Sequence, residues 1–254
     1  MSTPDPATEL SRLGRDYADL LARLEANQAR FQRLARAMYR VQEDERRRLA
    51  RDLHDGLGQN LTALKHQLML LEASLGEAAH AASPRLADAL SLCEQTLADT
   101  RQLSRLLRPQ VLDDLGLVPA LRWLGRTLAQ PAGVSVEVEA GALPALDEDT
   151  RTLVFRIAQE ALTNSIRHAG AEHAGFRLSA EAGRLRFEAW DDGQGFDAGQ
   201  ASLGASASEG TGLGAMRERV ALHGGTLRLT TYPGAGTQLR LDVPLPGDTV
   251  RLGA

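Results

Sequence analysis

Apolar residues recur every seven positions through the first forty residues of the chain. They form two series offset by three or four residues, which is the spacing of the core positions in a coiled coil. Asn27 interrupts the second series, and a polar residue in that place can fix the register or the number of strands. The repeat predicts a parallel coiled-coil dimer over residues 8–41, and a helix packed against its own domain is the alternative. The two series are Leu10, Tyr17, Leu24, Phe31 and Met38, and Leu13, Leu20, Leu34 and Val41.

A second apolar stripe begins after the repeat changes phase near residues 43–48. It runs from Leu49 to Leu75 with mixed three- and four-residue spacing, and another stripe runs from Leu86 to Leu107. The small and polar residues 76–84 separate the two, so the pattern predicts a helical hairpin with a short loop. One hairpin cannot bury both stripes well, whereas two hairpins can form a four-helix bundle. We therefore expect a dimerisation domain over residues 42–112.

The pattern changes to a mixture of helix and strand after Pro109. Alternation of apolar and polar positions predicts strands at residues 134–138, 175–180, 185–190, 226–231 and 237–243. Helical spacing predicts helices at residues 117–128, 147–168 and 212–223. Together they predict an α/β domain over residues 113–247, with a loop at residues 197–209. The expected fold class is multi-domain, α plus α/β.

Composition and charge narrow the setting in which the chain works. The 254 residues carry a formal net charge of -4, so no direct nucleic-acid partner is expected. A single cysteine, Cys93, excludes an intramolecular disulfide and a zinc site built from several cysteines. No apolar stretch reaches the roughly 20 residues of a transmembrane helix, and the first residues lack the apolar core of a secretory signal. We expect a soluble, cytoplasmic chain without a transmembrane segment.

A line of polar residues runs along the helix expected at residues 147–168. Glu160, Asn164 and His168 recur every four residues opposite the buried face. An asparagine carbonyl can ligate Mg²⁺ without adding negative charge beside phosphates, and a carboxylate one turn earlier can order a metal-bound water or the attacking group. Taken alone, the same line is typical of a solvated helix face.

Two glycine-rich segments follow this helix in the chain. Asp192 precedes Gly193 and Gly195 after a predicted strand, where its carboxylate could accept a hydrogen bond from an adenine amino group. Asp-Asp-Gly is also a common turn sequence. Residues 210–214, Gly-Thr-Gly-Leu-Gly, open a helix whose free N–H groups can hold phosphates.

These elements, in this order, resemble the ATP-binding domain shared by histidine kinases, Hsp90-type chaperones, gyrase and MutL, an α/β sandwich called the Bergerat fold. The resemblance covers residues 113–246 and implies ATP and Mg²⁺ as cofactors. It implies that Asn164 ligates the metal, that Glu160 is the helper carboxylate and that Asp192 binds adenine. It makes residues 197–209 a flexible lid. The other ATP-binding positions that it implies are Gly193, Gly195, Gly212, Leu213, Gly214 and Thr237.

A histidine lies beside a carboxylate on the amphipathic helix upstream. Residues 45–59, which include His54, Asp55 and Gln59, resemble the phosphoacceptor helix of sensor histidine kinases of the NarX/DesK-like branch. A neutral imidazole, with an unperturbed pKa of about 6.5, can attack the γ-phosphate of ATP. The resemblance implies that Asp55 holds or takes the ring proton. It also implies that Gln59 orients a water against a partner's aspartyl phosphate.

The sequence therefore predicts a homodimeric histidine kinase that phosphorylates His54 and passes the phosphoryl group to an aspartate of a response regulator. By resemblance, that regulator has a LuxR-type helix-turn-helix output. Transfer within one chain and transfer across the dimer both fit the pattern. Two alternatives share the ATP pocket: a conformational switch that binds ATP without forming phosphohistidine, and a scaffold in which phosphatase activity dominates.

Overall fold

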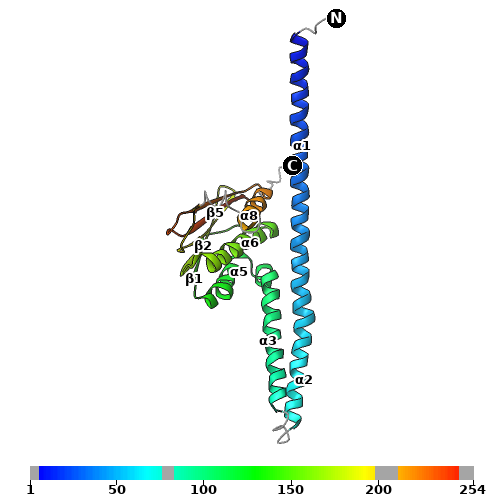
Figure 1. Ribbon diagram of the computed structural model, residues 1–254, viewed down its shortest axis with the longest axis vertical. Helices are drawn as coiled ribbons and strands as arrows, with labels where there is room; N and C mark the ends of the chain where they lie inside the picture. Colours follow the sequence, from blue (N-terminus) through cyan, green and yellow to red (C-terminus); the bar gives the residue numbers. More distant parts are fainter. Residues whose placement is uncertain (1–5, 76–82, 198–210, 246–254) are drawn as a thin grey trace, which may run out of the picture. The chain divides into compact units, whose positions relative to one another are not determined.

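A computed structural model describes residues 6–75, 83–197 and 211–245 (Figure 1). The chain divides into two compact units between Arg48 and Leu49. The first unit consists largely of α1, a helix that runs from Pro6 to Arg51. The helix expected from the seven-residue repeat is confirmed. Its described core positions are exposed in the single chain, and Phe31 is 72% exposed.

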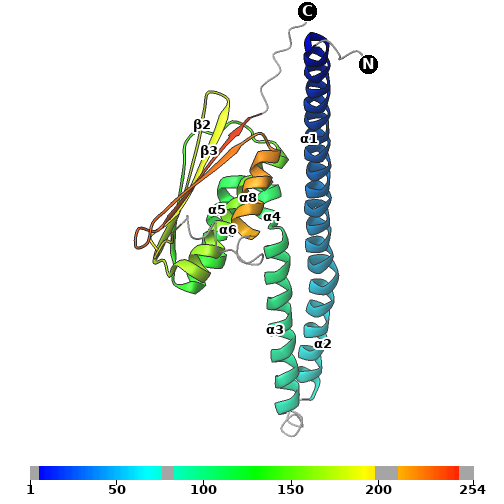
Figure 2. The ribbon, with the colours of Figure 1, turned by 45° about the horizontal axis from the view of Figure 1, so that its top comes forward.

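The second unit opens with the predicted helical hairpin. The π-helical segment η1 (Asp52–Gly58) leads into α2 (Gln59–Leu75), and α3 (Ser83–Leu107) lies beside them in both views (Figures 1 and 2). The expected loop falls largely on residues 76–82, outside the described part. α3 buries a stripe with helical spacing against its neighbour, made of Leu86, Cys93, Leu97, Thr100 and Ser104.

A five-stranded sheet follows, with strand order β1-β2-β3-β5-β4. The strands are β1 (Ser135–Ala140), β2 (His173–Glu181), β3 (Arg184–Asp191), β4 (Thr226–Thr231) and β5 (Thr237–Pro244). β1 pairs with β2 in parallel, and the other pairs are antiparallel. All five predicted strands are confirmed. They were predictable because a sheet with one covered face alternates apolar and polar residues along each strand.

The helices of this domain cover one face of the sheet. They are α5 (Leu117–Leu124), α6 (Glu148–Asn164) and α8 (Thr211–Leu222), and Figure 2 shows all three on the same side. The core between the layers includes Phe155 from α6, Phe187 from β3 and Leu241 from β5. The opposite face carries charge instead. Glu188 accepts from Arg240 Nε at 2.8 Å on that face.

Local sequence explains where two of these helices begin and end. Asp147 caps α6, since its carboxylate accepts a hydrogen bond from the Thr150 backbone N–H at 2.7 Å. α8 ends just before a pair of glycines, where Gly224 adopts φ +69° and the Gly225 N–H donates to the Val220 carbonyl at 3.0 Å. A left-handed glycine satisfies the last carbonyls of a helix in this way.

Several elements were not predicted. The short helix α4 (Gln110–Asp114) follows Pro109. Three helices continue into π-helical turns: η1 after α1, η3 (Gly125–Ala129) after α5, and η5 (Ser165–Ala169) after α6. The apolar periods of α- and π-helices differ too little to be separated over five to seven residues. The helical region followed by an α/β domain nevertheless confirms the expected fold class.

Among the described residues, no helix combines the length and the apolarity that a membrane span requires.

Candidate functional site

A cavity of about 590 Å³ lies at the covered face of the sheet, bounded by α6, η5, the start of α8 and strands β2, β3 and β5. Its size suits a small ligand of nucleotide dimensions. Most of the residues expected in an ATP site line it: Glu160, Asn164, Gly195, Gly212, Leu213 and Thr237. Segments far apart in the sequence thus meet around one cavity. The greater part of the expected lid, residues 198–209, and Gly210 lie outside the described residues.

The position expected for Asp192 is contradicted by the structure. Its carboxylate does not line the cavity but accepts hydrogen bonds from the backbone N–H groups of Glu172 and His173, each at 2.9 Å. Its Oδ2 also lies 2.9 Å from His173 Nδ1. The pKa of the Asp192 carboxyl lies below its usual value. The hydrogen bond from the His173 backbone N–H is the largest cause, and the hydrogen bond with the His173 ring is the next. Asp192 therefore fixes the start of β2 from outside the cavity.

Asp191 occupies the place expected for its neighbour. It lines the cavity, and its Oδ2 accepts from Ser165 Oγ at 2.8 Å while its Oδ1 accepts from the Gly193 N–H at 3.0 Å. Strand parity could have identified it. Leu185, Phe187 and Ala189 are the buried residues of β3 beneath the helices, and Asp191 continues that same face. A slip of one residue moves a side chain to the other face of a strand.

The turn after β3 requires glycine because the backbone is packed closely on both sides. A Cβ at Gly193 would come within 2.6 Å of the Ala169 carbonyl oxygen. The next residue, Gln194, donates its backbone N–H to that oxygen at 2.8 Å and its side-chain amide to the His168 carbonyl at 2.6 Å. Gly195 has φ +57°, and a Cβ there would collide with the Tyr232 carbonyl oxygen. These contacts join the turn to the end of η5 and to the β4–β5 connection.

The second glycine segment meets the helper carboxylate. A Cβ at Gly212 would lie 2.6 Å from Glu160 Oε1, so any larger residue would displace the carboxylate or the first turn of α8. Gly214, by contrast, is exposed, does not line the cavity and has open space where a Cβ would be. Of the expected glycines, Gly212 is therefore the one that brings the α8 N-terminus against α6.

Thr237 lies directly opposite Asp191 in the β3–β5 register and lines the cavity. Sequence reasoning missed its neighbour Thr231, which is buried at the end of β4. Thr231 Oγ1 accepts from the Phe196 N–H at 3.1 Å and donates to the Gly236 carbonyl at 2.9 Å. This hydroxyl connects residue 196 to the β4–β5 turn. It thereby helps to position the start of β5, which pairs with Asp191.

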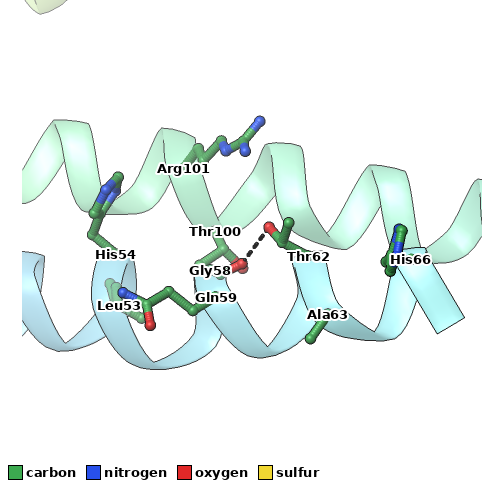
Figure 3. Close-up of a pocket in the computed structure, with 9 residues that line it drawn as sticks. All are labelled: Leu53, His54, Gly58, Gln59, Thr62, Ala63, His66, Thr100 and Arg101. Atoms are coloured by element: carbon green, nitrogen blue, oxygen red, sulfur yellow. Dashed lines mark hydrogen bonds between the residues drawn. The ribbon is translucent and has the colours of Figure 1, made fainter.

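His54 lies in η1 of the hairpin and its side chain is exposed. It lines a groove of about 400 Å³ together with Gln59, Thr62 and residues of α3 (Figure 3). The Gln59 side chain runs back along the helix toward His54 in this view. Thr62 Oγ1 donates to the carbonyl of Gly58, the last residue of η1, at 2.7 Å. Asp55 is exposed and does not line the groove.

The oxygen atoms that line the cavity suit a metal ion that is also bound by the phosphates of a nucleotide. Within the described ranges, no group of three or more His, Cys, Asp or Glu side chains is placed to hold a metal ion. Asn164 offers one neutral oxygen to the cavity, with Glu160 one turn earlier on α6. A Mg²⁺ ion often takes few protein ligands and completes its octahedron with phosphate oxygens and water, so these residues fit a nucleotide-bound magnesium.

Known families match both parts of the second unit. Residues 45–112 match the family described as "Histidine kinase", and residues 149–247 match the family described as "Histidine kinase-, DNA gyrase B-, and HSP90-like ATPase". Among solved structures, the histidine kinase domain of a blue-light activated kinase from Erythrobacter litoralis aligns with 74% of this chain and 94% of its own, at 22% identity and a TM-score of 0.47.

Curated relatives match over most of this chain. The sensor histidine kinase MctS of Rhizobium johnstonii is 36% identical over 85% of this chain and 46% of its own length. The histidine-protein kinase/phosphatase DegS of Brevibacillus brevis is 30% identical over 81% of this chain and 52% of its own. ComP, a sensor histidine kinase of Bacillus subtilis, is 31% identical over 84% of this chain and 28% of its own. The chain thus spans about half, or less, of the length of these relatives.

The order of the two matched domains, the cavity in the second and the exposed histidine in the first agree with one another. The chain belongs to the sensor histidine kinases of the NarX/DesK-like branch, with an ATPase domain of the histidine kinase, gyrase and Hsp90 type.

Proposed function

We propose that this chain is the kinase core of a two-component system, which uses ATP to phosphorylate His54 and transfers the phosphoryl group to an aspartate of a response regulator. The observation that carries the proposal is the cavity itself. Glu160 and Asn164 of α6, Asp191 of β3 and Gly212 of α8 come from three separate segments and line one nucleotide-sized space. The other matched domain of the chain presents an exposed histidine.

Each pocket residue has a distinct task in this proposal. Asp191 accepts a hydrogen bond from the adenine amino group, taking the place expected for Asp192, and Thr237 supports it from the opposite strand. Asn164 ligates Mg²⁺ and Glu160 orders a metal-bound water or the attacking group. The free N–H groups at the start of α8 face the phosphates. Gly193 and Gly195 shape the turn, and Leu213 adds an apolar contact.

The reaction at His54 is a displacement at the γ-phosphorus. One imidazole nitrogen forms a bond to phosphorus while the bond to the β,γ-bridging oxygen breaks and ADP leaves. Asp55 holds or takes the proton of the other ring nitrogen. Because the His54 side chain is exposed, it is accessible to an ATP-loaded domain and afterwards to a regulator.

A second activity, removal of the phosphoryl group from the regulator, is supported by one observation. Gln59 lines the same groove as His54, where its amide can orient a water against an aspartyl phosphate. The relative DegS is described as a kinase/phosphatase. We propose that Gln59 serves the reverse activity, which Gln59→Ala would reduce while leaving the formation of phosphohistidine intact.

We infer that the functional form is a homodimer. The hairpin leaves Leu57, Leu64 and Leu71 about half exposed at seven-residue spacing, and the core positions of α1 are exposed as well. Histidine kinases of this family dimerise and signal to response regulators. A second copy would cover both stripes as a parallel coiled coil and a four-helix bundle.

The regulator that we propose carries a LuxR-type helix-turn-helix output, so DNA is reached only through that partner. We place the chain in the cytoplasm, where ATP and such a regulator are present.

Labelling with γ-labelled ATP and Mg²⁺ tests the proposal. The wild-type protein should acquire a label that is labile in acid and stable in base, and His54→Gln should lose it. His66→Gln is the matched control, because His66 is an exposed histidine that lines the same groove. A label that persists in His54→Gln would contradict the proposal.

A further inference from the structure

Arg101 projects from α3 at the groove that holds His54 (Figure 3). One wall of this groove is made by η1 and α2, and the other wall is made by Thr100 and Arg101 of α3. Sequence reasoning gave no role to α3 beyond packing. The groove is nevertheless lined both by Arg101 of α3 and by His54 of η1.

The pairing of the two helices fixes this neighbourhood. Cys93 Sγ lies 3.4 Å from the Leu61 carbonyl oxygen, and Ser104 Oγ donates to the Ala50 carbonyl oxygen at 2.7 Å. From Cys93 to Ser104 is eleven residues, and from Leu61 back to Ala50 is also eleven. The two antiparallel helices therefore keep the same pairing register between these two contacts. By the same register, residues 100 and 101 lie opposite residues 54 and 53.

The charge of the groove favours an anion. Its lining holds one arginine, Arg101, and no carboxylate. Two other cations near this groove are paired with carboxylates: Arg46 with Glu43 at 3.0 Å and Lys65 with Glu94 at 2.7 Å. Within the part of the chain that the structure describes, Arg101 forms no ion pair. A guanidinium group is suited to donate two parallel N–H bonds to a phosphate.

We propose that Arg101 binds the phosphoryl group carried by His54, with its guanidinium donating to the phosphoryl oxygens of phosphohistidine. The inference rests on the proposed function and adds a residue to it from the second helix of the hairpin. Because the contact exists only when His54 is phosphorylated, Arg101 shifts the equilibrium between His54 with ATP and phosphohistidine with ADP toward phosphohistidine. Binding of ATP in the cavity does not depend on it, because Arg101 does not line that cavity.

The equilibrium can be measured without a regulator, so that any effect concerns the phosphoryl group on His54 itself. The purified 254-residue chain is incubated with fixed ratios of ATP to ADP and Mg²⁺ until the fraction of phosphohistidine is constant. Arg101→Gln should lower the equilibrium constant by about tenfold, as expected for loss of a charge-assisted hydrogen bond at an exposed site. Arg101→Lys keeps the charge and should recover part of the loss.

Two matched variants separate this role from a structural one. Arg85→Gln removes an exposed arginine of the same helix that does not line the groove. His66→Gln changes a groove residue that is roughly 18 Å from His54 by the rise of a helix. Both should keep the wild-type equilibrium constant, and all variants should keep the wild-type affinity for ATP.

The possible outcomes are distinct. Phosphohistidine on the wild type with an unchanged equilibrium constant in Arg101→Gln would overturn the inference alone. An equal loss in Arg101→Gln and Arg85→Gln would overturn it too, because the effect would then be general to α3. Absence of phosphohistidine from a wild type that binds ATP would overturn the proposed function together with the inference.

Discussion

Asp191 and Asp192 are adjacent in the chain, but their carboxylates lie in different environments. The first lines the cavity and is held by Ser165 and Gly193, and the second is exposed and bonded to the start of β2. Adjacent strand residues face opposite sides of a sheet, so only one of the two aspartates, Asp191, can contact a ligand in the cavity.

We expect Asp191→Asn to weaken ATP binding by roughly tenfold to a hundredfold, because a hydrogen bond to a charged acceptor is worth about 1.5–3 kcal/mol. The matched variant Asp192→Asn should change the affinity by less than about threefold. Isothermal titration with a non-hydrolysable ATP analogue measures both. Equal losses in the two variants, with thermal unfolding unchanged, would refute the assignment of Asp191.

Asn164→Asp tests the metal ligand. The new carboxylate is nearly isosteric but adds a negative charge beside the phosphates, so we expect labelling of His54 to fall at least about a hundredfold. Circular dichroism and thermal unfolding should show a folded domain. Retained labelling in a folded Asn164→Asp protein would exclude the role of Asn164 in binding Mg²⁺.

The residues that sequence reasoning placed correctly in the cavity lie on helices or next to glycines. Glu160 and Asn164 share a face by four-residue spacing, and Gly195 and Gly212 allow close approaches. Asp192 was misplaced because a pair of identical residues at a strand end leaves the register open by one position. Thr231 was missed because the role of its hydroxyl depends on contacts with residues 196 and 236, which no local pattern encodes.

At the scale of elements, the strand and helix boundaries were largely predictable and the π-helical turns were not. β4 and β5 lie within one residue of their expected bounds, since turn residues flank clear alternation. η1 contains His54 and two glycines and follows α1 without a break, so periodicity alone gave no sign of it. π-helical turns often occur at functional sites.

The glycines of these elements make a testable contrast. Gly56 in η1 has open space around the place of a Cβ, whereas Gly116 at the start of α5 has φ +84°. Gly56→Ala should raise the free energy of unfolding by about 0.5–1 kcal/mol, and Gly116→Ala should lower it by about 1 kcal/mol or more. Urea unfolding measures both changes. If both variants were stabilised, the backbone conformation assigned to Gly116 would be wrong.

At the scale of the whole molecule, function depends on surfaces that a single chain leaves exposed. The apolar positions of α1 and the stripe of Leu57, Leu64 and Leu71 are costly to expose. The sequence predicted these stripes because periodicity is visible without a structure.

Leu64→Lys should raise the dissociation constant of the dimer at least about tenfold, because the interface would then bury a charge. Sedimentation equilibrium over a dilution series measures this constant. Tyr232→Ser serves as the control, since Tyr232 is also a large exposed hydrophobic residue but lies between β4 and β5. A dimer as tight as wild type in Leu64→Lys would contradict the proposed bundle.

The central claim is that the ATP cavity and the hairpin histidine form one enzyme. The most direct test is to locate the phosphoryl group by tandem mass spectrometry after incubation with ATP and Mg²⁺, with peptides kept at neutral to basic pH so that phosphohistidine survives. The account predicts the group on the imidazole of His54, and a roughly tenfold to hundredfold smaller amount of it after Asp191→Asn at limiting ATP. A phosphoryl group on another side chain, or none on a protein that binds ATP, would contradict the account.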